Sequence, residues 1–495
     1  MLKSQRSIGV VLSYFHFALN IVVNFLYVPF LISSLGDDEY GLYQLMGSLI
    51  AYFSVFDFGI SNSTVRFYSL YKTNNDETGK SSVLSTSMMM FSLISLVVLL
   101  LGGVLFFSID PIFGNTLSTG QISEAKTIFL IQLFNVVVSL LGKTFNAVIT
   151  AEEKFLFHKL SLIVQASLQP IAMFSIVSQA PYALTVVIIQ TVFNVLINFT
   201  HLIYVFIKIP PKFSFRRFDH QLIKSFLKLS LSIFIVAITD QVFWKTNQFI
   251  LGARVGTSAV TVYAVAAQIY MNYMVISSTI QGVFLPKVTA LVTQNKNREV
   301  NSLFINIGKV QFLILGLVLI GFTCVGKDFI NLWVGADFLD AYWIALITMF
   351  AMTIDLIQNL GCTVLQSMNR YGIRALVLIT AAIVNVVFVV VFADFGGIAC
   401  ASVSAICIVV ANGPVMNFFY KRIACLNVLS FWKEIFKIFV KLLIILVAAM
   451  VVSHINIPFG HIISFIVKIV IIVLIYLLVL FKDIINLKNS LKSND

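Results

Sequence analysis

The chain has 495 residues, of which 59% are hydrophobic and only 11% are charged, and its mean hydropathy is +0.98. These values exclude a soluble globular protein and indicate an all-α, polytopic membrane protein. The formal net charge of +12 does not indicate a nucleic-acid partner, because basic residues of membrane proteins gather in cytoplasmic loops. The five cysteines form no CxxC motif, so neither a disulfide framework nor a metal site is predicted.

Apolar runs predict about fourteen transmembrane helices joined by short connections, with no soluble domain. The first run follows Lys3 and Arg6 and is too long for a signal peptide, whose apolar region has about 7–15 residues, so we expect an uncleaved span. The predicted spans are approximately 8–32, 42–65, 83–108, 126–149, 158–178, 183–207, 225–251, 258–285, 306–326, 341–367, 375–394, 397–418, 438–454 and 461–481.

Basic residues are divided unequally between the two sides of these spans. If the N-terminus is inside, the inner segments hold 27 of the 33 lysines and arginines. The other six are Lys126, Arg254 and Lys327 in outer segments and Lys143, Lys245 and Lys468 within spans. Because cytoplasmic loops carry the excess of Lys and Arg, the pattern predicts that both termini are cytoplasmic.

The two halves of the chain share a weak internal repeat. The spacing Gly36–Tyr43 between spans 1 and 2 recurs 220 residues later as Gly256–Tyr263 between spans 7 and 8. Six spans per half predict two six-helix lobes related by pseudo-twofold symmetry, with two extra C-terminal helices. The predicted domains are an N-lobe at 1–207, a basic cytoplasmic linker at 208–224, a C-lobe at 225–418, and spans 13–14 with a tail at 419–495.

The seventh predicted span contains Asp240 and Lys245 at membrane depth. A charge near the bilayer centre costs about 2.5–3.5 kcal/mol on insertion scales, so these side chains are expected to face protein or water. At about 100° per residue, Gln241, Lys245 and Gln248 share one helix face. This pattern predicts that the span forms one wall of a polar cavity.

Other predicted spans also contain ionisable or polar side chains, among them Asn24, Asp57, Lys143, Asn146 and Asp355. For the uncharged residues the alternative to cavity lining is hydrogen bonding between helices. For the charged residues it is internal ion pairing, for example of Asp240 with Lys143 or Lys245. Arg66 and Arg254 lie near the predicted membrane surfaces, where a loop charge without a ligand explains them equally well.

The sequence resembles the polysaccharide exporters and Wzx-like oligosaccharide flippases of the multidrug/oligosaccharidyl-lipid/polysaccharide (MOP) exporter superfamily. The residues that carry this resemblance are Pro29–Leu31, Leu35–Tyr43, Asp57–Ile60, Arg66, Asp240–Gln241, Ile250–Gly252, Gly256, Tyr263 and Trp333–Gly335. The resemblance implies a two-lobed helical bundle that alternates between inward-open and outward-open states. It also implies a transporter and not an enzyme, which moves an undecaprenyl-pyrophosphate-linked oligosaccharide to the outer leaflet for O-antigen or capsule assembly.

That function implies a bacterial cytoplasmic (inner) membrane location, with membrane lipids, a polysaccharide polymerase and glycosyltransferases as partners. Cations suit the pyrophosphate, and amides suit sugar hydroxyls. The predicted substrate-binding residues are Lys143, Lys245, Arg66, Arg254, Gln241, Gln248, Asn146 and Asn24. No cofactor is expected, but a proton or sodium gradient is a candidate driving force, with Asp57, Asp240 and Asp355 as the coupling residues.

Other functions remain open from the sequence. A cation-coupled drug or metabolite antiporter of the same superfamily would favour an anionic cavity, which Lys143 and Lys245 argue against. A peptidoglycan lipid-precursor flippase would have the same number of spans. A membrane glycosyltransferase or polymerase usually needs a large extramembrane loop, and these loops are short. A membrane scaffold would not need charges in both halves.

Overall fold

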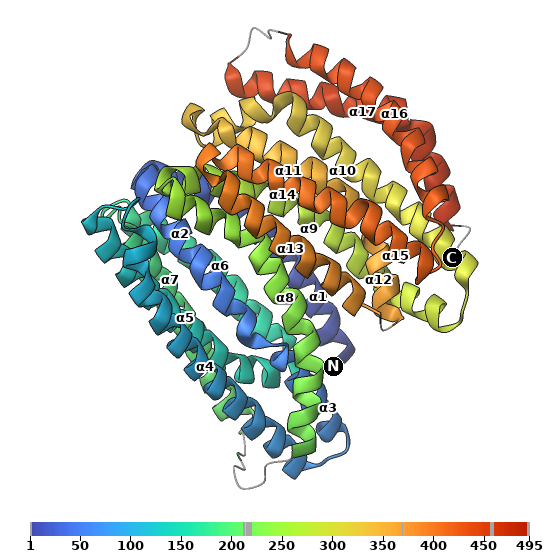
Figure 1. Cartoon of the computed structure of the whole chain (residues 1–495). Helices are drawn as coiled ribbons and strands as arrows, with labels where there is room; N and C mark the ends of the chain where they lie inside the picture. Colours follow the sequence, from blue (N-terminus) through green and yellow to red (C-terminus); the bar gives the residue numbers. More distant parts are fainter. Residues whose placement is uncertain (1, 211–212, 214–219, 369, 456–459, 493–495) are drawn as a thin grey trace. The chain divides into compact units, whose positions relative to one another are not determined.

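A computed structural model describes residues 2–210, 213, 220–368, 370–455 and 460–492. Every regular element in this part of the chain is a helix, which confirms the predicted all-α class (Figure 1). The helices form two compact units, Met1–Thr261 and Val262–Asp495. The predicted lobe boundaries stay a prediction. Residues 211–212 and 214–219 of the predicted linker lie outside the described residues.

The first unit contains eight α-helices, one short 3-10 helix and the beginning of a ninth α-helix. They are α1 (Leu2–Leu35), α2 (Asp37–Ser54), η1 (Val55–Asp57), α3 (Ile60–Thr73), α4 (Glu77–Phe113), α5 (Thr119–Ala151), α6 (Phe155–Val177), α7 (Ala183–Lys208), α8 (His220–Arg254) and the first turn of α9 (Thr257–Thr293).

Local sequence signals explain where two of these helices begin. Asp76 caps α4 by accepting a hydrogen bond from the Gly79 N–H at 2.8 Å. The Thr78 hydroxyl and the Gly79 N–H hold the pKa of Asp76 below its usual value. Ser118 and Gln121 form a reciprocal capping box at the start of α5.

The second unit continues α9 and adds helices that are interrupted at several points. They are α10 (Asn297–Trp333), η2 (Ala336–Phe338), α11 (Asp340–Leu356), α12 (Asn359–Ser367), α13 (Gly372–Phe392), η3 (Ala393–Phe395), α14 (Gly397–Val410), the π-helical η4 (Ala411–Val415), α15 (Met416–Arg422), α16 (Val428–Ser453) and α17 (His461–Lys492).

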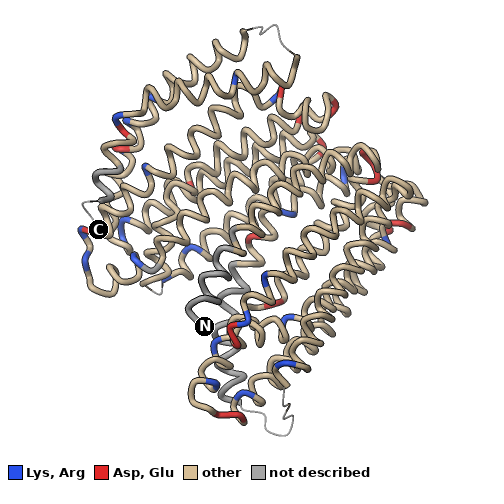
Figure 2. Tube along the Cα trace, turned by 180° about the vertical axis from the view of Figure 1, so that it is seen from behind, with Lys and Arg blue, Asp and Glu red and all other residues tan. Residues whose placement is uncertain are grey.

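In the described part of the chain, eleven helices are long and apolar enough to cross a membrane, and the bent pair α11–α12 makes twelve. The chain is therefore a multi-pass membrane protein. Each of the fourteen predicted ranges overlaps a helix or a run of consecutive helices, such as α2–α3. The count of fourteen spans itself stays a prediction. Figure 2 shows the charged residues concentrated near helix ends, as expected where helices leave an apolar environment.

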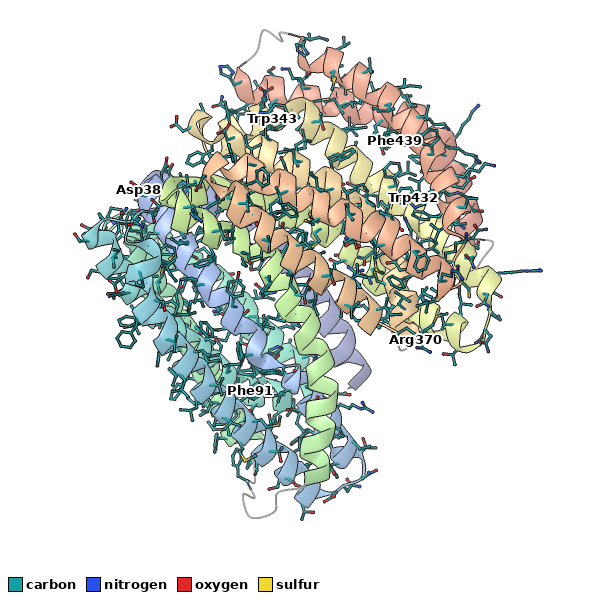
Figure 3. All side chains as sticks on the ribbon, in the orientation of Figure 1. Asp38, Phe91, Trp343, Arg370, Trp432 and Phe439 are labelled. Atoms are coloured by element: carbon teal, nitrogen blue, oxygen red, sulfur yellow. The ribbon has the colours of Figure 1, made fainter. Side chains whose placement is uncertain are left out.

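The two glycine junctions of the internal repeat have similar local structure. Gly36 (φ 79°) separates α1 from α2, and Gly256 (φ 118°) separates α8 from α9. Both angles are in the range that favours glycine. Within the first unit, the Thr257 hydroxyl donates to Asp38 Oδ1 at 2.6 Å, and Figure 3 places Asp38 at the tip of α2. The repeated spacing thus marks two helix starts that lie against each other.

A candidate substrate-binding site in the first unit

The second predicted span is broken at Asp57. Helix α2 ends at Ser54, the single turn η1 follows, and Phe58 (φ 51°) and Gly59 (φ 69°) adopt left-handed conformations before α3 begins. A left-handed conformation at a bulky residue such as Phe58 costs on the order of 1 kcal/mol or more, so the surrounding packing must hold it. The break places the Asp57 carboxylate at the start of α3, where Oδ1 accepts from the Ser61 hydroxyl at 3.0 Å.

Asp57 forms an ion pair with Lys143 of α5. The Lys143 Nζ lies 3.2 Å from Asp57 Oδ2, and the two side chains are 31% and 26% exposed. Helix α5 packs against both α2 and α3, so it reaches both sides of the break. The sequence offered Asp240 as an ion partner of Lys143, whereas the carboxylate found beside it is that of Asp57.

Helix α8 presents Lys245 beside this region. It packs against α2, η1, α3 and α4, and a hydrogen bond of 2.7 Å between the Thr246 and Tyr52 hydroxyls joins it to α2. Lys245 is half-buried, and it forms no ion pair with any residue that the structure describes. A half-buried ammonium without a neighbouring carboxylate leaves this part of the unit with an excess of positive charge.

The predicted polar face of α8 is only partly turned inward. Gln248 is 2% exposed, and its Oε1 atom accepts no hydrogen bond from the described residues. Gln241 is half-buried, like Lys245, whereas Asp240 is exposed. Gln248 therefore offers a buried acceptor for a hydroxyl or amide donor.

The polar side chains of α5 fall into two groups. Toward its start, Asn135 donates to the Thr191 hydroxyl at 2.7 Å and Ser139 donates to Asn194 at 3.1 Å. These are bonds between α5 and α7, the alternative that the sequence left open. One turn beyond Lys143, the buried Asn146 Oδ1 accepts no hydrogen bond in the described part. Lys143 and Asn146 thus remain as the ligand candidates on this helix.

The other predicted substrate residues of this unit lie on its surface. Asn24 of α1 is exposed, and Arg254 is exposed at the end of α8. Arg66 of α3 is also exposed, with its guanidinium 5.8 Å from the centre of the Phe67 ring. The assignment of these three residues as ligands stays a prediction.

The third predicted coupling carboxylate, Asp355, belongs to the second unit. It lies near the end of α11, just before the 41° bend into α12, and its Oδ2 is 3.3 Å from Nη2 of Arg374. In the sequence, Arg374 is one of the 27 basic residues of the predicted inner segments. No local pattern identifies it as a partner, because the ion pair joins α11 and α13, which are brought together by packing against α14.

Comparison with known proteins shows the family to which the sequence belongs. Residues 10–292, more than half of the chain, match the family described as "Polysaccharide biosynthesis protein". The chain belongs to this polysaccharide biosynthesis family. The membership confirms the family resemblance read from the sequence.

Individual relatives agree with the family and the fold. The chain is 20% identical over 400 residues to a Shigella flexneri protein named "Putative O-antigen transporter", covering 79% of this chain and 92% of that protein. It matches the structure of "Lipid II flippase MurJ, inward closed conformation" with a TM-score of 0.72 and 17% identity, over 97% of this chain and 99% of the other.

A second structural match is an inward-facing multidrug resistance MATE family transporter of the MOP superfamily. The TM-score is 0.69 and the identity 13%, with 84% of this chain and 96% of that chain covered. At these identities the likeness concerns the fold alone. This member of the polysaccharide biosynthesis family therefore has the fold of MOP superfamily transporters.

Proposed function

We propose that the protein is a flippase that moves a polyprenyl-pyrophosphate-linked oligosaccharide from the cytoplasmic to the outer leaflet by alternating access. The observation that carries the proposal is the charge of the candidate site. Asp57 balances one lysine, Lys143, whereas Lys245 has no carboxylate partner among the described residues. A half-buried excess cation suits a pyrophosphate, whose transfer through an apolar membrane requires compensating charge and hydrogen bonds.

The uncharged groups suit the glycan. The buried oxygens of Gln248 and Asn146 accept no described hydrogen bond, so each can receive one from a sugar hydroxyl. The polyprenyl chain would stay among the membrane lipids, which avoids the cost of transferring it into water. No covalent bond is broken in this process, so no catalytic residue is assigned.

The proposal includes a cellular setting. The protein would work in the bacterial inner membrane with both termini in the cytoplasm, beside the glycosyltransferases that build the repeat unit and the polymerase that extends it. Membership of the polysaccharide biosynthesis family supports this setting. A proton or sodium gradient would drive the cycle through Asp57, Asp240 or Asp355, with no bound cofactor.

A peptidoglycan lipid-precursor flippase is the second candidate, supported by the structural match to MurJ. The charge chemistry would be the same, because both substrates join a glycan to a lipid through phosphate. A drug antiporter is less compatible with the site, since an organic cation would be repelled by Lys245.

The decisive experiment follows lipid-linked glycans after deletion of the gene. We expect the repeat unit to accumulate on the cytoplasmic leaflet, protected from an impermeant glycan-modifying enzyme added outside, while peptidoglycan synthesis continues. Accumulation of the peptidoglycan precursor would select the second candidate. Loss of drug resistance with normal surface glycan would contradict both.

A further inference from the structure

A second charged region lies near the last turns of α3, the helix that follows the break at Asp57. A cavity of about 280 Å³ is lined by side chains at the end of α3, the start of α4, the α5–α6 connection and the end of α7. Its ionisable wall residues are Tyr68, Glu77, Lys80, Glu152, Lys154 and Lys208. This wall is mostly polar, unlike the lipid-facing helix surfaces around it.

The two carboxylates of the wall already have basic partners. Glu152 accepts from the Lys72 ammonium at 2.6 Å, and Glu77 forms an ion pair with Lys80 one turn along α4. Tyr68 is buried, and the Lys80 ammonium lies 5.8 Å from the centre of its ring. The two wall carboxylates therefore pair with Lys72 and Lys80, and neither pairs with Lys154 or Lys208.

Lys154 and Lys208 form no ion pair with any described residue. Lys154 is half-buried where α5 gives way to α6, and Lys208 is exposed at the last residue of α7. The wall lysines are Lys80, Lys154 and Lys208, and Lys72, which is not part of the wall, pairs with Glu152. Because Glu77 pairs with Lys80, the two wall carboxylates are both balanced, and Lys154 and Lys208 leave two positive charges for a ligand. Lysine ammonium groups on flexible stems are suited to a compact anion, above all a phosphate.

We propose that this cavity binds a phosphate-bearing group through Lys154 and Lys208. The volume suits a small head group and is too small for a folded partner. The cavity also lies where apolar helices end, the depth at which the phosphates of membrane lipids are found. The ligand is either the anionic head group of a membrane lipid or a phosphate compound free in solution. Neither source requires that the protein carry a glycan.

The test measures binding of two probes to the purified full-length protein in detergent. One probe is inorganic pyrophosphate, and the other is phosphatidylglycerol, with phosphatidylcholine as the uncharged reference. The cavity variant Lys154→Gln/Lys208→Gln removes two positive charges. The control variant Lys296→Gln/Lys437→Gln removes the same charge from exposed lysines that each pair with a glutamate three residues away in the sequence.

We expect the cavity variant to weaken binding of at least one probe by roughly tenfold or more, and the control variant to change it less than about twofold. Loss of phosphatidylglycerol binding alone identifies a lipid head group, and loss of pyrophosphate binding identifies a soluble ligand. Equal affinities of the two variants for both probes, or no binding of either probe by the unaltered protein, would overturn the proposal. Lys208→Gln alone, at an exposed position, repeats the test if the double variant unfolds.

Discussion

Among the described residues, each unit has an acid–base pair at an interrupted helix, and the two pairs differ in their surroundings. In the first unit Asp57 meets Lys143, and the side chains are 31% exposed for the lysine and 26% for the aspartate. In the second unit Asp355 forms an ion pair with Arg374. The arginine side chain is 13% exposed and the aspartate side chain is 22% exposed. The first pair is more open, and α8, which packs on its helix break, adds the uncompensated Lys245.

We propose that the difference separates a binding role from a structural one. A partly exposed pair with an extra cation nearby can exchange its carboxylate partner for a ligand phosphate at modest cost. A more enclosed and balanced pair loses more when either member is removed, because the remaining charge stays buried. We therefore assign ligand binding to the first pair and, as a hypothesis, stabilisation of the α11–α12 bend to the second.

Removal of either candidate lysine should have the largest effect on transport. Lys143→Ala and Lys245→Ala should lower surface glycan display by roughly thirtyfold or more, because losing one member of a desolvated charge pair costs about 2–5 kcal/mol. The measurement is glycan display normalised to membrane protein level. Lys143→Arg, which keeps the charge, should retain most activity. Normal display in both alanine variants would remove these lysines as ligands.

The next effect should come from the carboxylate of the first pair. Asp57→Asn keeps an acceptor for the Ser61 hydroxyl but releases Lys143, so the site becomes more cationic. We expect tighter retention of the lipid-linked glycan and transport slowed by about tenfold, as for the loss of a typical charge-assisted bond. Binding and transport should be measured on the same preparation. If the Asp57→Asn variant transports as fast as the unaltered protein across a range of external pH, the result would argue against Asp57 as a coupling residue.

Disruption of the second pair should reduce stability more than it alters substrate binding. Arg374→Ala leaves the Asp355 carboxylate without its partner and should lower the free energy of unfolding by about 1–3 kcal/mol. The double variant Asp355→Ala/Arg374→Ala should recover part of that loss, since no unpaired charge remains. Thermal unfolding in detergent measures both. A double variant whose loss of stability equals the sum of the two single losses would contradict an interaction between the two side chains.

Effects of equal or smaller size concern the two glycines of α2, which lie in different surroundings. A Cβ at Gly41 would lie 2.3 Å from the carbonyl oxygen of Thr257, whereas a Cβ at Gly47 meets nothing within 4 Å. Gly41→Ala should therefore destabilise the first unit by about 1–3 kcal/mol. Gly47→Ala on the same helix should be neutral or stabilising by up to about 1 kcal/mol. Equal unfolding temperatures for the two variants would show that the contact between the repeated junctions is not tight.

The sequence predicted much of the fold but only part of the site. The helical class and the approximate helix ranges followed from apolar runs, and the Gly36 and Gly256 junctions followed from their repeated spacing. The break after Asp57 was missed, because an apolar count treats residues 42–65 as continuous. The Phe58–Gly59 pair was the available signal, since glycine in an apolar helix often marks a local change of conformation.

Hydrophobicity acts on each segment separately, so amino-acid order alone was enough to establish a multi-pass helical membrane protein with unevenly distributed basic loops. Ion pairing depends on side chains far apart in the sequence, such as Asp57 and Lys143, and no local pattern specifies which of several carboxylates a lysine will meet. Helix packing also decided the bonding of two asparagines on the same helix. Asn135 donates a hydrogen bond to α7, whereas the Asn146 Oδ1 accepts none from the described residues.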